Sequence, residues 1–462
     1  MSTFKSLIAT TAIAGIALAA GYYAGIQRAP TSAETVVTAN AVDTGSPVPA
    51  TEPDMPRASF HGPAGDPTSA APAPSTLPPQ SGQAHLDQVV DPDAKFTHFR
   101  VGQRNVKRIM ADGDYMWVGT SGGAIRYNLT SDDYRLFDIR SGLLANGIFY
   151  IGKLQDRIAL GTYGGGLALY NETGDKWDIY NIPQGLGDAF VYDALEMPNG
   201  DIWIATWSGA NRIRGGDLDD RSKWDLFTVE NTGGGLPNDW VYGLAAGKDG
   251  EVWMATEGGL AKYIDGKWSN WNHENGLGAP YELVKSQIQF SNDPAEYSKH
   301  HSRQKTEMGL QDVDVAYNPN YIVSLVVDND GSVWAGTWGG GLAHFDGKRW
   351  TNFTVADGLP ANHVFSLHRD PDDRIWIGTS KGLAIRNASG FDTYTIADGL
   401  FSDIVFSMAS ANDGSAWIGS FGGVARIAAV SYTHLTLPTI VRECSSRWAA
   451  GGYMGGGGGG GG

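Results

Sequence analysis

Residues 374–379 read Arg-Ile-Trp-Ile-Gly-Thr, and the tetrad within them, Trp376-Ile377-Gly378-Thr379, is the pattern that decides the fold. Seven versions of the tetrad occur; six begin with Trp and one with Ala. The others are Trp117 to Thr120, Ala159 to Thr162, Trp203 to Thr206, Trp253 to Thr256, Trp334 to Thr337 and Trp417 to Ser420. Their first residues are 42, 44, 50, 81, 42 and 41 positions apart, which is the period of a four-stranded propeller blade.

Each repeat contains four short segments with the alternation of a strand. In the sixth repeat they are Val364 to Leu367, Arg374 to Thr379, Gly382 to Ile385 and Phe391 to Tyr394. Asp-Gly turns such as Asn329-Asp330-Gly331 precede the Trp segments and favour tight hairpins. The pattern therefore predicts an all-β fold, a seven-bladed β-propeller of four-stranded blades over residues 96–427.

The two ends of the repeat array predict how the ring closes. The seventh repeat stops after its third strand, Gly423 to Ile427, whereas the array opens with Phe96 to Phe99, which matches a fourth strand. We expect the N-terminal strand to complete the last blade, because closure removes the exposed edges of an open array.

The N-terminus predicts export. Lys5 precedes an uncharged, largely apolar run, Leu7 to Ile26, whose 20 residues would span a bilayer core of roughly 30 Å as a helix. Residues 1–28 are interpreted as a signal anchor, with a cleaved signal peptide as the alternative because Ala17 to Ala20 suits a signal peptidase. The protein is then periplasmic and tethered to the inner membrane through residues 7–26, or secreted if cleavage occurs.

Two further segments have no predicted core. Residues 29–95 are rich in Pro, Ala, Ser and Thr and are interpreted as a disordered linker. Residues 428–462 end in the glycine run Gly455 to Gly462, and Ser431 to Ile440 resembles a translated sequencing adapter, so this tail is interpreted as non-native.

Charge and cysteine content exclude several functions. The formal net charge is -16, which disfavours nucleic acid and an anionic membrane surface as partners. The single cysteine, Cys444, lies in the tail, so the repeats have no thiolate metal site and no covalent haem motif. We expect no cofactor, apart from the divalent metal considered below.

The repeat unit resembles a known family. Asp-Gly-x-x-Trp-Ile-Gly-Thr followed by Gly-Gly-Leu, together with the loop Asp357 to Asn362, is similar to the two-component regulator propeller repeat of periplasmic sensors in hybrid two-component systems. The resemblance covers about Phe96 to Ile427 and implies an extracytoplasmic sensory or ligand-binding propeller. Since no kinase or receiver pattern is present, a signal would pass to a membrane or periplasmic protein partner.

Loops that converge on one face of the ring supply the candidate ligand site. One set of residues follows the second strand of each repeat, and an Asx set precedes the first strand. The ligand-binding candidates are Tyr163, Trp207, Glu257, Trp338, Phe421, Asn146, Asp239, Asn320, Asn362 and Asp403. Aromatic rings beside polar groups suit a small molecule or an oligosaccharide, although Asx residues also initiate turns and aromatics also wedge between blades.

The doubled interval indicates an insertion over residues 278–320, on the same face as the candidate site. Long insertions on one face of a repeat fold are commonly binding elements or lids. Imidazoles within and beside it could bind a divalent metal, although their spacing matches no established signature. The metal candidates are His273, His300, His301 and His363.

Two other function classes remain open. A propeller lyase or glycosidase acting on extracytoplasmic polysaccharide or glycoconjugate would need carboxylates or a His over the channel, for which Glu257, Glu282, Asp239 and His273 are available. An assembly scaffold would need no such groups. We assign no catalytic residue, because no nucleophile, zinc or phosphate-loop motif appears.

Overall fold

The computed structural model describes residues 81–83, 96–131, 133–288, 293–296, 299–313 and 315–428, and most of its regular elements are strands. Five antiparallel sheets contain four strands each. They are β6 (Ile148–Leu154), β7 (Arg157–Thr162), β8 (Leu167–Asn171) and β9 (Lys176–Tyr180); β10 (Val191–Glu196), β11 (Ile202–Thr206), β12 (Gly209–Ile213) and β13 (Trp224–Phe227); β14 (Val241–Ala246), β15 (Val252–Thr256), β16 (Gly259–Ile264) and β17 (Lys267–Trp271); β18 (Asn318–Val327), β19 (Val333–Trp338), β20 (Leu342–Phe345) and β21 (Trp350–Phe353); and β22 (Val364–Arg369), β23 (Ile375–Thr379), β24 (Gly382–Asn387) and β25 (Gly390–Tyr394).

A further sheet has seven strands in the order β1-β5-β4-β3-β2-β27-β26. Its strands are β1 (Ser81–Gln83), β2 (Phe96–Asp112), β3 (Tyr115–Thr120), β4 (Gly123–Asn128), β5 (Asp133–Phe137), β26 (Val405–Ser410) and β27 (Ala416–Ile427). The first part of β2 pairs with β27, from Phe96 opposite Ile427 to Arg100 opposite Gly423. The second part pairs with β3. The predicted pairing of the first strand with the last repeat is confirmed.

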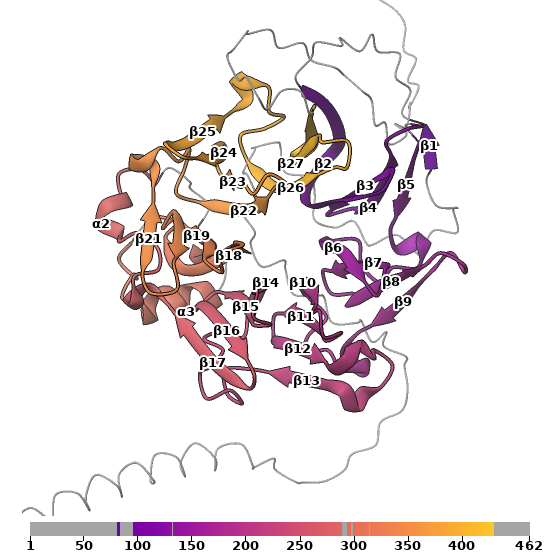
Figure 1. The fold of residues 1–462 in the computed structure, drawn as a ribbon, viewed down its shortest axis with the longest axis horizontal. Helices are drawn as coiled ribbons and strands as arrows, with labels where there is room; N and C mark the ends of the chain where they lie inside the picture. Colours follow the sequence, from indigo (N-terminus) through magenta and orange to yellow (C-terminus); the bar gives the residue numbers. More distant parts are fainter. Residues whose placement is uncertain are drawn as a thin grey trace, which may run out of the picture. The chain divides into compact units, whose positions relative to one another are not determined.

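The sheets are arranged as in a propeller; each four-stranded sheet has one strand nearest the centre, and the seven-stranded sheet has two, β2 and β26 (Figure 1). Each innermost strand contacts the next one along the chain, and β26 contacts β2, so the series closes on itself. These innermost strands are β2, β6, β10, β14, β18, β22 and β26. The arrangement leaves a central channel lined by the first strand of every repeat.

In five repeats the tetrad tryptophan stacks on an aromatic ring of the outer strand. Trp203 stacks on Phe227 at 5.4 Å between ring centroids, and Trp334 stacks on Phe353 at 5.9 Å. Trp417 makes the same contact with Phe99 of β2 at 5.0 Å. The N-terminal strand therefore supplies the outer aromatic side chain that the last repeat lacks.

The other tetrad positions also have structural roles. The Thr379 hydroxyl donates to Gly382 O at 2.8 Å, which closes the turn to the next strand, and Thr206 and Thr256 repeat this bond. A Cβ at Gly378 would lie 2.8 Å from Val405 O of the neighbouring sheet. Glycine at this position therefore allows adjacent sheets to approach closely.

A recurrent 3-10 turn follows the outer strand in five of the repeats. At 355–357 the Thr354 hydroxyl accepts from Ala356 N, and the Asp357 carboxylate accepts from Thr354 N at 2.8 Å. Gly358 follows with φ +102°, a left-handed conformation that favours glycine. The next residue, Leu359, is buried between sheets. The Asp-Gly-Leu motif thus ends one blade and anchors the start of the next.

Short helices lie within the predicted insertion. They are α2 (Tyr281–Val284), a 3-10 turn at Pro294–Glu296, and α3 (Lys299–Glu307), and β18 begins at Asn318. In α3, the Lys305 ammonium donates to Asp293 at 2.5 Å and to Val313 O at 2.6 Å. These contacts join α3 to residues on either side of it within the insertion.

The predicted membrane segment and tail lie outside the described residues, as does most of the predicted linker. Within the linker range, however, Ser81–Gln83 forms β1 and pairs with β5. An edge strand has unpaired backbone groups that accept such an added strand. Among the residues that the structure describes, no helix is long and apolar enough to cross a membrane.

Candidate functional site

A β-bulge occurs in each innermost strand at the same place. In β10 the pairing with β11 passes from Val191 directly to Asp193, and in β22 the pairing with β23 passes from Val364 directly to Ser366. The residue between them has no partner in the neighbouring strand and is called the skipped residue. A bulge redirects side chains, so that two consecutive residues of one strand can face the same side. The skipped residues are Lys107, Phe149, Tyr192, Tyr242, Val323, Phe365 and Phe406, and all of them line one central cavity.

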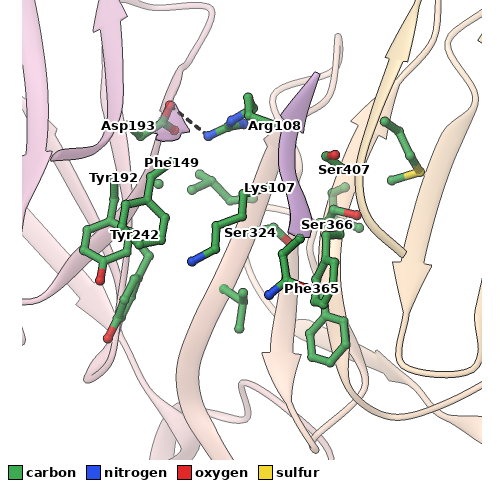
Figure 2. Close-up of a pocket in the computed structure, with 17 residues that line it drawn as sticks. Lys107, Arg108, Phe149, Tyr192, Asp193, Tyr242, Ser324, Phe365, Ser366 and Ser407 are labelled. Carbon is green, nitrogen blue, oxygen red and sulfur yellow. Dashed lines mark hydrogen bonds and ion pairs between the residues drawn. The ribbon is translucent and has the colours of Figure 1, made fainter. Parts of the chain in front are cut away.

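The cavity lies between the innermost strands and has a volume of about 130 Å³. Its walls differ in character (Figure 2). Lys107 and Arg108 project from β2, and aromatic rings including Tyr192, Tyr242 and Phe365 lie around them. The residues that follow the bulges add the hydroxyls of Ser324, Ser366 and Ser407. The cavity therefore combines cationic groups, aromatic faces and hydroxyls.

An ion pair between Arg108 and Asp193 crosses part of the cavity, with Nη2 and Oδ1 3.2 Å apart. Asp193 also accepts from Leu244 N at 2.9 Å and from Ala194 N at 3.1 Å. Burial raises the pKa of Asp193 above its ordinary value, and the Arg108 guanidinium and these two N–H groups oppose that rise. Arg108 Nε is buried without a hydrogen-bond partner among the described residues. The Asp193 carboxylate therefore accepts three hydrogen bonds, whereas the Arg108 guanidinium has an N–H donor, at Nε, that makes no hydrogen bond with a described residue.

Three serines and Lys107 are further polar groups of the cavity, and their contacts differ. Ser366 Oγ and Ser407 Oγ donate to carbonyl groups of the neighbouring inner strand, Val405 O at 3.4 Å and Val106 O at 3.0 Å. Ser324 Oγ is buried and has no hydrogen bond to any described residue. The Lys107 ammonium lies 4.0 Å from the centroid of the Phe149 ring, in a cation–π contact.

The insertion is fastened above one side of this channel by a buried polar cluster. The His301 imidazole from α3 forms an ion-pair contact with the Glu257 carboxylate, and both side chains are almost fully buried. The Tyr242 hydroxyl donates to the other Glu257 oxygen at 3.3 Å. His301 also stacks on Tyr321 and meets Trp240 edge-on, each with ring centroids 5.5 Å apart. Because the Tyr242 ring lines the cavity, one side chain contacts both the cavity and the cluster.

A family model described as the two component regulator propeller matches residues 235–258, 316–339 and 358–381. Each match contains the turn, the bulged inner strand or the tetrad strand described above. These three segments are two-component regulator propeller repeats.

Solved structures with this fold include both sensors and enzymes. The extracellular domains of two hybrid two-component systems from B. thetaiotaomicron match with TM-scores of 0.56 and 0.51, at 19% and 18% identity over 76% and 72% of this chain. This chain spans 45% and 39% of those two. A catalytically inactive virginiamycin B lyase from Staphylococcus aureus matches with a TM-score of 0.51 at 12% identity, over 72% of this chain and 99% of the lyase. These likenesses show the fold. No curated protein matches the chain significantly.

The predicted rim aromatics of the regulator propeller lie in one cluster that continues into the cavity lining. Tyr163, Trp207 and Phe421 are partly buried in it, whereas Trp338 is 1% exposed and Glu257 is fully buried. Trp207 stacks between Phe190 and Trp240, at 4.3 and 4.8 Å between centroids. The rings contact one another and the insertion, so most of their surface is already covered.

The predicted Asx set shares a structural role in the loops. Asn362 Oδ1 accepts from Val355 N at 3.0 Å, and Asp403 Oδ1 accepts from Ile396 N at 2.7 Å; each tethers the preceding 3-10 turn. The equivalent bonds of the other members are Asn146 to Ile139 N, Asp239 to Val229 N and Asn320 to His273 N. These side-chain oxygens therefore organise the loops of the propeller face.

The metal candidates are placed in separate contacts. Nδ1 of His273 lies 2.9 Å from Leu277 O, His363 Nε2 lies 2.7 Å from Ala316 O, and His301 contacts Glu257. The side chain of His300 lies outside the described part of the structure. Within the described residues, no group of three potential metal ligands converges.

The sequence analysis missed the residues of the cavity. A pattern was available, because every repeat has a buried Val or Ile just before the bulge residue, as in Val241-Tyr242 and Val405-Phe406. Five of the bulge residues are aromatic, and Lys107 is the cation among them. Without a known bulge, however, the alternation of a regular strand places Lys107 and Arg108 on opposite faces.

Proposed function

We propose that this chain is an extracytoplasmic sensory propeller that binds a small ligand in its central cavity and passes the bound state to a partner protein. The observation that carries the proposal is the cavity, in which Lys107 and Arg108 face an aromatic lining and Arg108 Nε has no hydrogen bond to any residue that the structure describes. Buried polar groups in folded proteins are nearly always hydrogen-bonded, so groups left without a partner in a cavity mark a place for a ligand.

The proposal includes a ring of seven blades. The seven-stranded sheet divides at β2, whose first part belongs with β26 and β27 and whose second part belongs with β3, β4 and β5. Together with the five four-stranded sheets, this division gives one blade for each tetrad. The bulge that occurs in every innermost strand supports the same division.

The location is proposed from the N-terminus and from the family. Leu7 to Ile26 is long and apolar enough to anchor or export the chain. The structurally similar two-component proteins are described as extracellular domains. The propeller would then act outside the cytoplasm, joined to the membrane by residues 29–95 if the apolar segment is retained.

A route from ligand to partner passes through Tyr242. Its ring lines the cavity, and its hydroxyl donates to Glu257, which in turn contacts His301 of α3. A ligand that displaces the Tyr242 ring would change the contacts among Tyr242, Glu257 and His301, and with them the position of α3. The exposed face of α3, with Arg303 80% exposed, is then the surface offered to a protein partner.

A ligand screen with a blocked cavity tests the proposal. The full chain is unfolded thermally in the presence of oligosaccharides, small organic acids, divalent metals and soluble extracytoplasmic proteins. A ligand at 100 times its dissociation constant should stabilise the chain by about 2.7 kcal/mol. Ser324→Leu fills the cavity without removing a hydrogen bond, and it should abolish the stabilisation.

Ser389→Leu, at an exposed turn, is the matched control and should retain the stabilisation. The proposal fails if no compound stabilises the chain, or if Ser324→Leu responds to every ligand as strongly as the parent does.

A further inference from the structure

We infer that the central cavity binds a small organic anion, with the anionic group between Lys107 and Arg108 and a one-ring body against the aromatic lining. This inference rests on the proposed function and adds the chemical class of the ligand. It is carried by the charge, the hydrogen-bonding groups and the size of the cavity.

The cavity is positively charged in an acidic protein. Its charged lining residues are Lys107, Arg108 and Asp193, so two cations face one carboxylate and the formal balance is one positive charge. The whole chain carries -16. A cation-lined recess with low-dielectric aromatic walls concentrates the electric field and attracts anions. An anionic ligand would complete the neutralisation of the lining.

The hydrogen-bonding groups of the cavity are unevenly used. Asp193 accepts from Arg108 and from two backbone N–H groups. Arg108 carries five N–H donors, and Nη2 makes the hydrogen bond that the structure gives to this side chain. Ser324 Oγ also has no hydrogen bond to a described residue, and its hydroxyl can donate or accept, so the surplus is weighted toward donors by the guanidinium. A complementary ligand therefore brings acceptors, and a carboxylate brings two in the geometry that a guanidinium prefers.

The bulge explains why two cations reach one ligand. In β2 the pairing passes from Val106 opposite Thr120 to Arg108 opposite Gly119, which skips Lys107. Both consecutive side chains then line the cavity, with Lys107 projecting among the aromatic rings (Figure 2). Every other bulge residue around the cavity is uncharged, so the anionic end of a ligand has one preferred orientation.

The size of the cavity limits the body of the ligand. An engineered apolar cavity of about 150 Å³ accommodates benzene. The central cavity, at about 130 Å³, is therefore suited to one ring rather than to an oligosaccharide chain. Phe149, Tyr192 and Phe365 offer faces for either an aromatic ring or the apolar face of a sugar.

The test compares matched acids and neutral compounds on the full chain. The probes are benzoate against benzamide and glucuronate against glucose, with binding measured by calorimetry and by ligand-observed NMR. At least one acid should bind about tenfold or more tightly than its neutral partner, since a hydrogen bond to a charged group is worth at least that factor. Binding of benzoate alone would identify an aromatic acid, and binding of glucuronate alone a sugar acid.

Substitutions assign the effect to the cavity. Arg108→Met and Lys107→Met should each weaken binding of the acid by about tenfold and leave the neutral probe unchanged. Arg349→Met removes the same charge from a side chain that is 82% exposed on an outer strand turn, and it should have no effect. If Arg108→Met fails to fold, Lys107→Met still decides the question, because it leaves the ion pair of Arg108 with Asp193 in place.

Two results would overturn the inference. If neutral probes bind as tightly as the acids, or if both cavity variants bind the acids like the parent, the ligand is not an anion, while the proposed function stands. If none of the four probes binds, the inference fails, and the proposed function fails with it only when the broader screen also finds no stabilising ligand.

Discussion

The rim beneath the insertion and the central cavity use the same kinds of residue in opposite ways. At the rim, Glu257, His301 and Trp338 are buried against one another or against neighbouring rings. In the cavity, Lys107 and Arg108 face a space of about 130 Å³ beside aromatic rings and serine hydroxyls. Rim and cavity share one aromatic cluster, but the cationic side chains Lys107 and Arg108 line the cavity.

This difference shows that residue type at a loop position does not identify a ligand site. Aromatic and Asx residues at the rim look like a sugar platform in the sequence, yet their side chains support turns and the insertion. A ligand site is better recognised by the space and the charge that its side chains enclose than by residue type alone. The following predictions use this criterion, and the largest expected effect comes first.

Truncation of the buried rim tryptophan should destabilise the protein most. Trp338→Ala removes a side chain that is 1% exposed and stacked on Tyr321, so it should cost roughly 3–5 kcal/mol in the free energy of unfolding. Urea unfolding measures this loss. Trp207→Ala, at a partly buried position, should cost clearly less. Equal, small losses for both would mean that the rim is open to ligands.

The rim should also lose stability in mild acid. Burial lowers the pKa of His363 to about 4, from an ordinary value near 6.5, and the hydrogen bond with Ala316 O only partly opposes this shift. The unfolded chain binds more protons between these values, so the contribution of His363 is complete above pH 6.5 and is lost as the pH falls toward 4. The loss should be on the order of 3 kcal/mol.

Thermal unfolding across this pH range, compared with His363→Gln, isolates the effect. The variant should show a flatter profile, because glutamine does not titrate and can still donate to Ala316 O. Parallel profiles for the parent and the variant would show that His363 is not buried in neutral form.

The polar cluster should hold the insertion in place. Glu257→Gln removes the charge that contacts His301 while keeping the size of the side chain, and it should cost about 2 kcal/mol. Faster amide hydrogen exchange should appear in α3 and not in distant sheets. Glu282→Gln, whose side chain is 74% exposed in α2, serves as the control and should change neither quantity. Unchanged exchange in α3 would refute the fastening role.

A cavity cation should contribute little to stability. Lys107→Met keeps a long apolar stem beside Phe149 and removes an ammonium that is partly exposed in the cavity. The free energy of unfolding should change by less than about 1 kcal/mol. A loss as large as that of Trp338→Ala would place Lys107 among the structural residues and remove the contrast between cavity and rim.

Much of the fold could be predicted from the sequence, because it depends on local repeats. The tetrad marks the second strand of every repeat, and the pairing of Phe96 with Ile427 followed from a missing fourth strand. The strand at Ser81–Gln83 was not predicted, since three polar residues carry no strand signal and form β1 only beside the edge of β5.

The cavity could not be predicted in the same way. A one-residue bulge turns the Lys107 side chain to the opposite face of the strand, and the sequence of one strand does not reveal the bulge. The pairing of Arg108 with Asp193 joins residues 85 positions apart, on strands that meet only when the sheets close around the channel. The contact of His301 with Glu257 depends likewise on how the insertion folds back over the ring.

The most direct test of the account compares ligand-induced stabilisation in one cavity variant and one rim variant. For a ligand found in the screen, held at 100 times its dissociation constant for the parent, the parent should gain about 2.7 kcal/mol. Arg108→Met should lose most of this gain, and Trp207→Ala should keep it. If Trp207→Ala abolishes the stabilisation and Arg108→Met retains it, the ligand binds at the rim and the central claim is wrong.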